Sequence, residues 1–327
     1  ADKLALARFS STARGQGWQL QSDCSVSELL QSWRQPENLI QLLWRPRCLA
    51  ALNTPLESAS AQVFLHVLRD SLGAARAASD MLLSKTDLST LLPEAAARTI
   101  FGLGGEVFTG TTIDRIQADG AGWKLLPRAS AHQFGPMQEI ALEETYASVI
   151  IATPPQQAAH LLQPHCPATQ LSHFSYQAIT TCYLQYAPQV RLARPFFALR
   201  DDAEAKRWGQ FVFDRGQLMP DQAGLLAVII SAATQAATVP QAQLAQQIAQ
   251  QLSSDFAQEQ LAQPLWHQVI SEKRATFACE VGLLRPDNAT ALESVFLAGD
   301  YTVGDYPATL EAATRSGVRA AQLLLNA

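Results

Sequence analysis

The chain has 327 residues, of which 48% are hydrophobic and 16% are charged, and its formal net charge is −5. This composition excludes a disordered chain, which would combine low apolar content with high net charge. At roughly 150 residues per domain, the length predicts about two domains. A negative net charge does not attract a polyanion, so no nucleic-acid partner is expected.

Residues 1–100 are predicted to be mainly helical. Ser25 and Glu28 form the pattern of a capping box ahead of apolar residues at helical spacing. A second apolar helix is expected over 59–72. A third is expected over 91–100, where Pro93 suits the first turn.

After Gly102 the pattern changes to that of strands, and alternation predicts three of them, over 106–116, 123–126 and 138–142. A β-branched run over 146–152 predicts a buried strand, which the following prolines end. A short helix is expected next, over 156–162.

From residue 172 onward the predicted strands are 178–186, 196–199, 209–214, 225–231 and 266–276, and a long helix interrupts them over 241–256. The chain ends in a predicted strand over 294–297, a loop, and a helix from Pro307 to Leu325. Long helices with scattered strands predict an α/β fold class of mixed α+β texture.

The last thirty residues carry the most informative motif. A buried apolar strand ends in Ala298-Gly299-Asp300, where glycine lets a ligand approach the backbone and aspartate offers acceptors to hydroxyl groups. The predicted helix from Pro307 begins with small residues. Its free N–H groups and positive partial charge would stabilise negative charge on a flat ring.

The string LAGDYTVGDYPATLEAATRSG over 297–317 resembles the C-terminal FAD motif of the flavin-containing amine oxidase and phytoene desaturase superfamily. The segment 146–155 resembles its strand followed by Pro-Pro, and 104–116 resembles the segment beside the adenine. Within the superfamily, residues 43–70 and 272–277 resemble the hydroxysqualene dehydroxylases of hopanoid biosynthesis.

The resemblance implies a two-domain FAD-linked flavoenzyme of the amine oxidase type. Residues 1–100 would be a mainly helical part of the substrate domain, 101–165 part of the FAD domain, 166–280 the substrate domain, and 281–327 the C-terminal part of the FAD domain. The implied cofactor-binding residues are Ile113, Thr153, Pro154, Gly299, Asp300, Tyr306, Pro307, Ala308, Thr309 and Leu310.

The implied reaction is the reductive removal of an allylic hydroxyl from a polyisoprenoid, hydroxysqualene to squalene, with reduced flavin as the hydride donor. No residue that protonates the leaving hydroxide is identified, and Tyr306 and Arg274 are the catalytic candidates. An isoprenoid would be collected from a bilayer, so peripheral membrane contact through an apolar patch is expected.

One element of the superfamily is missing from this sequence. The superfamily opens with a strand and a GxGxxG turn that hold the FAD pyrophosphate on a helix N-terminus. The nearest match here, beginning at Gly102, has Val107 in the third glycine position and follows a helix. We therefore expect a chain without the first βαβ unit of the FAD domain, in which FAD is weakly bound or absent.

Alternatives remain open at this point. A carotenoid-type desaturase or an amine oxidase would use the flavin in the oxidising direction, although the stretch 179–184 lacks the lysine usual in amine oxidases. A non-catalytic chain unable to hold FAD is the third. Five aromatic residues of the substrate domain either line a tunnel or form plain core: Phe196, Phe197, Trp208, Phe211 and Phe213.

The cysteines and histidines predict no further chemistry. Five widely spaced cysteines are typical of free thiols in a reducing compartment, which favours a cytoplasmic protein, here at the inner face of the membrane. The six histidines form no HxH or HxxxH pair, so no metal site is expected.

Overall fold

The computed structural model describes residues 2–128, 144–167 and 169–326, and these form two compact units. Unit 1 comprises Ala1–Glu94 and Ser175–Gly282, and unit 2 comprises Ala95–Phe174 and Leu283–Ala327. The chain therefore crosses between the units three times, near residues 94, 174 and 282. The sequence predicted crossings at 100, 165 and 280.

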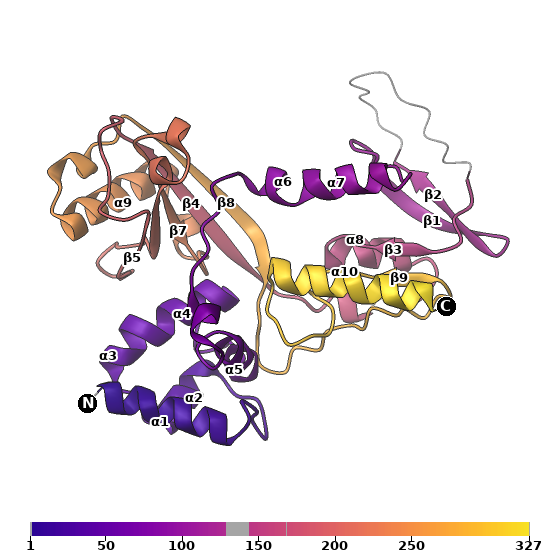
Figure 1. The fold of residues 1–327 in the computed structure, drawn as a ribbon, viewed down its shortest axis with the longest axis horizontal. Coiled ribbons are helices and arrows are strands. Elements are labelled where there is room, and N and C mark those ends of the chain that lie inside the picture. The colour runs from indigo at the N-terminus through magenta and orange to yellow at the C-terminus, as the bar shows by residue number, and fades with distance from the viewer. Residues whose placement is uncertain (1, 129–143, 168, 327) are drawn as a thin grey trace. The chain divides into compact units, whose positions relative to one another are not determined.

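The first part of unit 1 is helical (Figure 1). Ser25 caps α2 and exchanges both hydrogen bonds of the predicted capping box with Glu28. Five helices and a π-helical turn over Ile40–Trp44 pack around Trp44 and Phe64, which are fully buried. The helices are α1 (Asp2–Gly15), α2 (Val26–Ser32), α3 (Glu37–Leu39), α4 (Arg45–Leu52) and α5 (Ala61–Asp70).

The second part of unit 1 is a five-stranded antiparallel sheet in the order β5-β6-β7-β4-β8. Its strands are β4 (Tyr176–Gln185), β5 (Phe196–Ala198), β6 (Phe211–Asp214), β7 (Leu225–Ile230) and β8 (Trp266–Phe277). Helix α9 (Gln241–Phe256) covers one face, as Figure 1 shows, and its predicted stripe of Leu244, Ile248 and Leu252 is buried there.

The helical part is joined to the end of this sheet by a buried asparagine. The Asn53 side chain donates to Thr276 Oγ1 at 2.8 Å and accepts from the backbone N–H of Ala232 at 2.6 Å. Ser60 and Cys279 add a backbone hydrogen bond of 2.8 Å. Residues more than 200 positions apart therefore form one unit.

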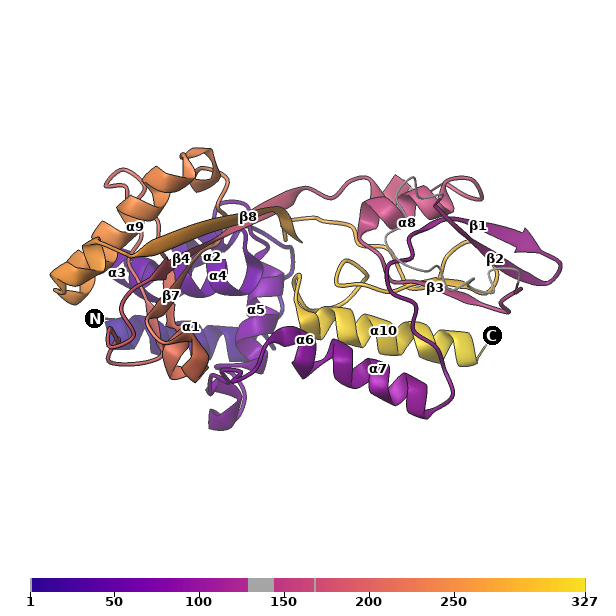
Figure 2. The ribbon, with the colours of Figure 1, turned by 90° about the horizontal axis from the view of Figure 1, so that it is seen from above.

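Unit 2 contains two small sheets. Strands β1 (Ile113–Asp119) and β2 (Gly122–Pro127) form an antiparallel hairpin, and β3 (Val149–Ile151) pairs in parallel with β9 (Val295–Leu297). Helix α8 (Pro155–Leu162) follows β3, and both α8 and α10 (Leu310–Leu325) are seen in Figure 2. The buried residues of α10 are Ala312, Ser316 and Ala320, and Ala320 packs against Phe296 of β9.

The segment between the helical part and the hairpin corrects one prediction. The helix expected over 91–100 is observed as α7 (Pro93–Gly102), with Pro93 in its first turn, and a separate short helix, α6 (Leu88–Leu91), precedes it. The predicted strand over 106–116 begins only at Ile113. Val107 and Phe108 are 37% and 44% exposed and are in no strand, because alternation produces a strand only where a neighbouring strand pairs with it. The predicted strand over 138–142 lies outside the described residues.

Candidate functional site

Four predicted cofactor-binding residues lie at one edge of the parallel sheet of unit 2. Thr153 and Pro154 follow β3, and Gly299 and Asp300 follow β9. The strands are in register, with Ile151 opposite Leu297. Because the carboxyl ends of parallel strands share an edge, the sheet brings these four residues together where ligands of open α/β sheets bind.

The backbone at Gly299 leaves no room for a side chain. A Cβ atom there would lie 2.4 Å from the ring of Tyr301, which is itself buried. Only glycine therefore permits this close approach of the backbone to the aromatic ring.

Asp300 is a partly buried carboxylate next to this glycine. Burial raises the pKa of its carboxyl above the usual range, although Arg285 and the backbone N–H groups of Asp300 and Tyr301 act in the opposite direction. Desolvation dominates, so the carboxylate lacks part of the hydrogen bonding that water would give it. Hydroxyl groups of a ligand would supply the missing hydrogen bonds.

A second atom at this edge is unsatisfied. The Thr153 Oγ1 is buried and has no hydrogen-bond partner in the described part of the chain. Buried polar atoms are paired in nearly all cases, so an orphan at a strand end is an indication of a missing ligand. Thr153, Gly299 and Asp300 thus fit a flat group that carries hydroxyls and polar ring atoms, as a flavin does.

The start of the C-terminal helix corrects the sequence prediction. Helix α10 begins at Leu310 and not at Pro307, because Thr309 is the N-cap and its Oγ1 accepts from the N–H of Ala312. Pro307 and Ala308 therefore lie in the loop that precedes the helix. The N–H groups of Leu310 and Glu311 have no acceptor among the described residues, as is usual in a first helical turn.

A buried polar network, which the sequence analysis missed, joins this helix to the strand end. Ser316 Oγ lies 2.8 Å from Asn288 Nδ2 and 2.7 Å from Thr302 Oγ1, and it accepts from the N–H of Gly299 at 3.0 Å. Asn288 also donates to the carbonyl of Leu297. Asn288 stands in a loop without a motif, so only its position in space reveals it.

Three other predicted residues lie elsewhere than at the β3–β9 edge. The ring of Tyr306 lies 5.0 Å from the Arg315 guanidinium, in the loop before α10. Ile113 lies at the start of β1, in the hairpin and not at the β3–β9 edge. Arg274 belongs to β8 of unit 1, where it is exposed and its guanidinium lies 5.9 Å from the Tyr176 ring.

The five aromatic residues of the substrate-domain prediction divide between the two faces of the sheet of unit 1. Phe197 and Trp208 pack against the core under α9. Phe196 lies on the other face, with ring centroids 4.9 Å from Phe213 and 5.8 Å from Phe211. Phe196, Phe211, Phe213, Ile229 and Ile270, which we call the open face, are only partly covered.

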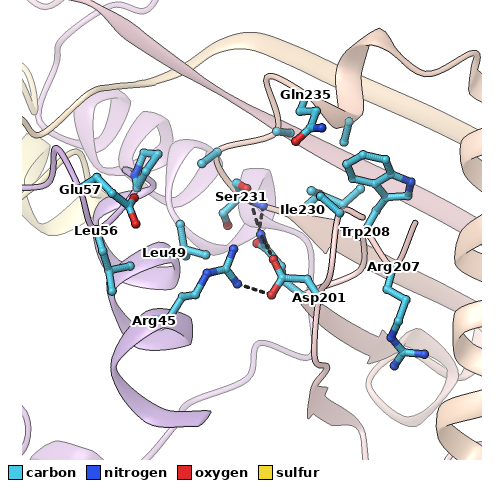
Figure 3. Close-up of a pocket in the computed structure, with 16 residues that line it drawn as sticks. Arg45, Leu49, Leu56, Glu57, Asp201, Arg207, Trp208, Ile230, Ser231 and Gln235 are labelled. Carbon is cyan, nitrogen blue, oxygen red and sulfur yellow. Dashed lines mark hydrogen bonds and ion pairs between the residues drawn. The ribbon is translucent and has the colours of Figure 1, made fainter. Parts of the chain in front are cut away.

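A separate cavity of about 190 Å³ lies at the end of the same sheet, beside α4 (Figure 3). Figure 3 shows Arg45 paired with Asp201 across it, and Asp201 also accepts from Gln210 at 3.2 Å. Gln210 in turn bonds to the backbone of Ser231. Arg45 and Asp201 are paired with each other and Arg207 is paired with Asp255, so these charges join parts of the protein. None of the predicted cofactor-binding or catalytic residues lines this cavity, although Trp208 does.

Other chemistry receives no support from the described residues. No group of three His, Cys, Asp or Glu side chains among them could hold a metal ion. Burial raises the pKa of the Cys182 thiol to about 12 and also raises that of Cys48, so neither is a thiolate nucleophile near neutral pH. Of the helices in the described ranges, none has the length and apolarity needed to cross a bilayer.

Comparison with known proteins agrees with the geometry of unit 2. The family model described as flavin containing amine oxidoreductase matches residues 40–325. Among curated proteins, the hydroxysqualene dehydroxylase of Rhodopseudomonas palustris is 32% identical over 291 residues, which is 88% of this chain and 63% of that protein. The hydroxysqualene dehydroxylase of Sinorhizobium fredii is 29% identical over 296 residues, with the same coverage of both chains.

Solved structures show the same fold. An oxidoreductase from Methanosarcina mazei matches 98% of this chain and 72% of its own, with a TM-score of 0.64 and 13% identity. Putrescine oxidase bound to putrescine matches 93% and 68%, with a TM-score of 0.66 and 14% identity. The chain spans slightly less than two thirds of the length of the curated relatives.

Proposed function

The chain belongs to the flavin containing amine oxidoreductase family, and from this premise we propose that it acts with FAD in the reductive dehydroxylation of hydroxysqualene to squalene. The family implies a flavin. The proposal goes further in three respects: it names FAD as the flavin, hydroxysqualene as the substrate, and a role in hopanoid biosynthesis. The observation that carries it is the β3–β9 edge, where the Thr153 hydroxyl is buried without a partner and the Asp300 carboxylate is partly desolvated beside Gly299.

The residues of this edge have distinct tasks in the proposal. Asp300 accepts hydrogen bonds from the hydroxyls of the ribityl chain. The N–H groups at the start of α10, from Thr309 and Leu310 onward, would hold the ring of the flavin and would stabilise negative charge on it. Tyr306 would border the bound ring near the substrate. When bound, the reduced flavin supplies the hydride chemistry.

The open face of unit 1 supports an apolar substrate. Phe196, Phe211 and Phe213 leave aromatic surface partly uncovered, and Ile270 is 50% exposed. A monomeric protein rarely leaves such a patch without use, and a polyisoprenoid is apolar along its whole length. The net reaction replaces a C–OH bond by a C–H bond and releases the oxygen as water.

The deciding experiment is an anaerobic assay of the purified protein with FAD, a reductant and hydroxysqualene, with squalene measured by gas chromatography and mass spectrometry. We expect squalene to form only when reduced flavin is present. Parallel assays with phytoene and with amines under oxidising conditions test the desaturase and amine oxidase alternatives. Flavin binding without any squalene would contradict the proposed substrate.

FAD binding itself is tested by titration of the 327-residue chain, followed by the visible absorbance and fluorescence of the flavin. The sequence contains no GxGxxG turn, so we expect weak binding. Tight binding by this chain would show that the pyrophosphate is held without that motif.

We also propose peripheral contact with the cytoplasmic face of a membrane. The proposed substrate dissolves in bilayers, and single apolar side chains such as Leu82 and Leu103 are 94% and 84% exposed. Co-flotation with vesicles of bacterial lipid is the test, and a protein that stays entirely in the aqueous fraction would contradict it.

A further inference from the structure

Arg285 contacts the loop between β9 and α10 through nearly its whole guanidinium. Its Nη1 donates to the backbone carbonyls of Gly304 at 3.0 Å and Tyr306 at 2.8 Å. Its Nη2 donates to the carbonyl of Asp300 at 2.5 Å, and its Nε to that of Tyr301 at 3.4 Å. One side chain thus gathers four carbonyls from a seven-residue span.

These contacts act on a loop whose middle residues are exposed to solvent, although Tyr301 and Thr302 near its start are buried. The loop runs from Asp300 to Tyr306, outside any helix or strand, and Val303, Gly304 and Asp305 within it are exposed. A loop of this kind has many backbone conformations of similar energy. A planar group with five donors in fixed directions selects the conformation in which the four carbonyls converge.

The segment 285–288, which contains Arg285, makes further hydrogen bonds that support the same arrangement. Val303 N–H donates to the carbonyl of Pro286 at 2.9 Å, and Asn288 holds the end of β9 through Leu297. Residues 285–288 therefore lie along the loop and bind it at both ends. The carbonyls of Asp300 and Tyr306 both accept from Arg285, so the backbone at these residues is fixed. The directions of their side chains are therefore fixed as well.

We propose that Arg285 is a positioning residue for the flavin site, which fixes Asp300 and Tyr306 in place before the cofactor binds. The proposal rests on the proposed function, because it assigns these two residues to the flavin. Arg285 itself need not touch cofactor or substrate. Its positive charge also favours the ionised form of the neighbouring Asp300.

The first test needs no flavin. Hydrogen–deuterium exchange over residues 299–309 is compared in the parent chain, Arg285→Ala and Arg285→Lys. We expect faster exchange in both variants, and more so in the alanine variant, because lysine places three donors on a single atom and cannot span four carbonyls. Equal exchange in the parent chain and the variants would overturn the proposal.

The second test measures FAD binding by fluorescence quenching in the same proteins. Loss of charge-assisted hydrogen bonds from one guanidinium predicts about tenfold weaker binding by Arg285→Ala. Millimolar methylguanidinium is expected to restore much of the affinity. Unchanged affinity with faster exchange would overturn the link to the cofactor site.

Arg128→Ala is the matched control. Arg128 lies in the same unit and pairs with Asp114 at 3.1 Å on the surface, so its loss should change neither the loop nor the response to methylguanidinium. If the parent chain binds no FAD at all, the proposed function fails, while the exchange experiment still decides whether Arg285 orders the loop. Should the alanine variant not fold, Arg285→Lys carries both tests.

Discussion

Single side chains decide where the elements of unit 2 begin and end, and Thr309 is the clearest case. Proline followed by small residues predicted a helix from Pro307, yet the helix begins after Thr309. The Thr309 hydroxyl satisfies the N–H of Ala312 at 3.2 Å, which no proline can do. Sequence spacing located the helix, and the capping hydrogen bond fixed its first turn.

We expect Thr309→Ala to lower the free energy of unfolding by about 1 kcal/mol, the usual cost of a lost N-cap. Urea denaturation measures it. Thr314→Ala is the control, since Thr314 is exposed in the same helix and its hydroxyl bonds only to the Leu310 carbonyl. Equal effects of the two substitutions would show that the cap does not stabilise α10.

Asp300 predicts a pH dependence of stability. Its pKa is raised in the folded protein, so the protonated form favours folding and this contribution is lost as the pH rises above the range of an ordinary carboxyl. Asp300→Asn should therefore raise the melting temperature at pH 7, with a smaller gain toward pH 4. Thermal unfolding across this range is the measurement.

Asp305→Asn gives the comparison for this experiment, because Asp305 lies exposed in the same loop. A gain at pH 7 from Asp300→Asn that persists unchanged at pH 4 would exclude the raised pKa as its cause. In the proposed flavin site, Asp300→Asn should weaken FAD binding, because a neutral amide is a poorer acceptor for hydroxyl groups than a carboxylate.

At the scale of elements, the sequence located helices and strands well where their periodicity is strong. Helix α9 has the predicted bounds, because Leu244, Ile248 and Leu252 repeat every four residues and pack on the sheet. The prediction of a strand over 106–112 was wrong, because a strand forms only beside a partner strand, and local alternation of residues does not show whether a partner is present.

The candidate site was only partly predictable for the same reason. Gly299 and Asp300 stand in a recognisable motif at a strand end. Arg285, Asn288 and Ser316 act through contacts with residues 9 to 28 positions away, and such contacts leave no local pattern. The structure places Ile113 in the β1–β2 hairpin and not at the β3–β9 edge; the resemblance had assigned its segment to the adenine.

Leu252 on α9 tests which face of this helix packs on the sheet. Leu252→Ala removes a fully buried side chain, so we expect a loss of about 2–5 kcal/mol in the free energy of unfolding. Gln250→Ala, on the exposed side of the same helix, is the control. Denaturant unfolding followed by far-UV circular dichroism distinguishes them, and similar effects would contradict the assigned face.

For the whole molecule, the two units differ in how fully their strands are paired. Residues 180–185 of β4 lie between β7 and β8, whereas Val149–Ile151 of β3 pair only with β9 among the described strands. Doubly paired strands over a large core open least readily. Amide exchange should therefore be slower in β4 than in β3, and the reverse order would contradict the assignment of the main core to unit 1.

The link from Ser60 and Asn53 to residues near the end of β8 has a consequence for biosynthesis. Ser60 leaves the ribosome long before its partner Cys279 is made. At roughly 5–20 residues per second, the helical part waits about 10–45 s for that partner. During this interval the nascent chain exposes the apolar surface later covered by the strands, so a chaperone that binds nascent chains would be needed most between these two moments of translation.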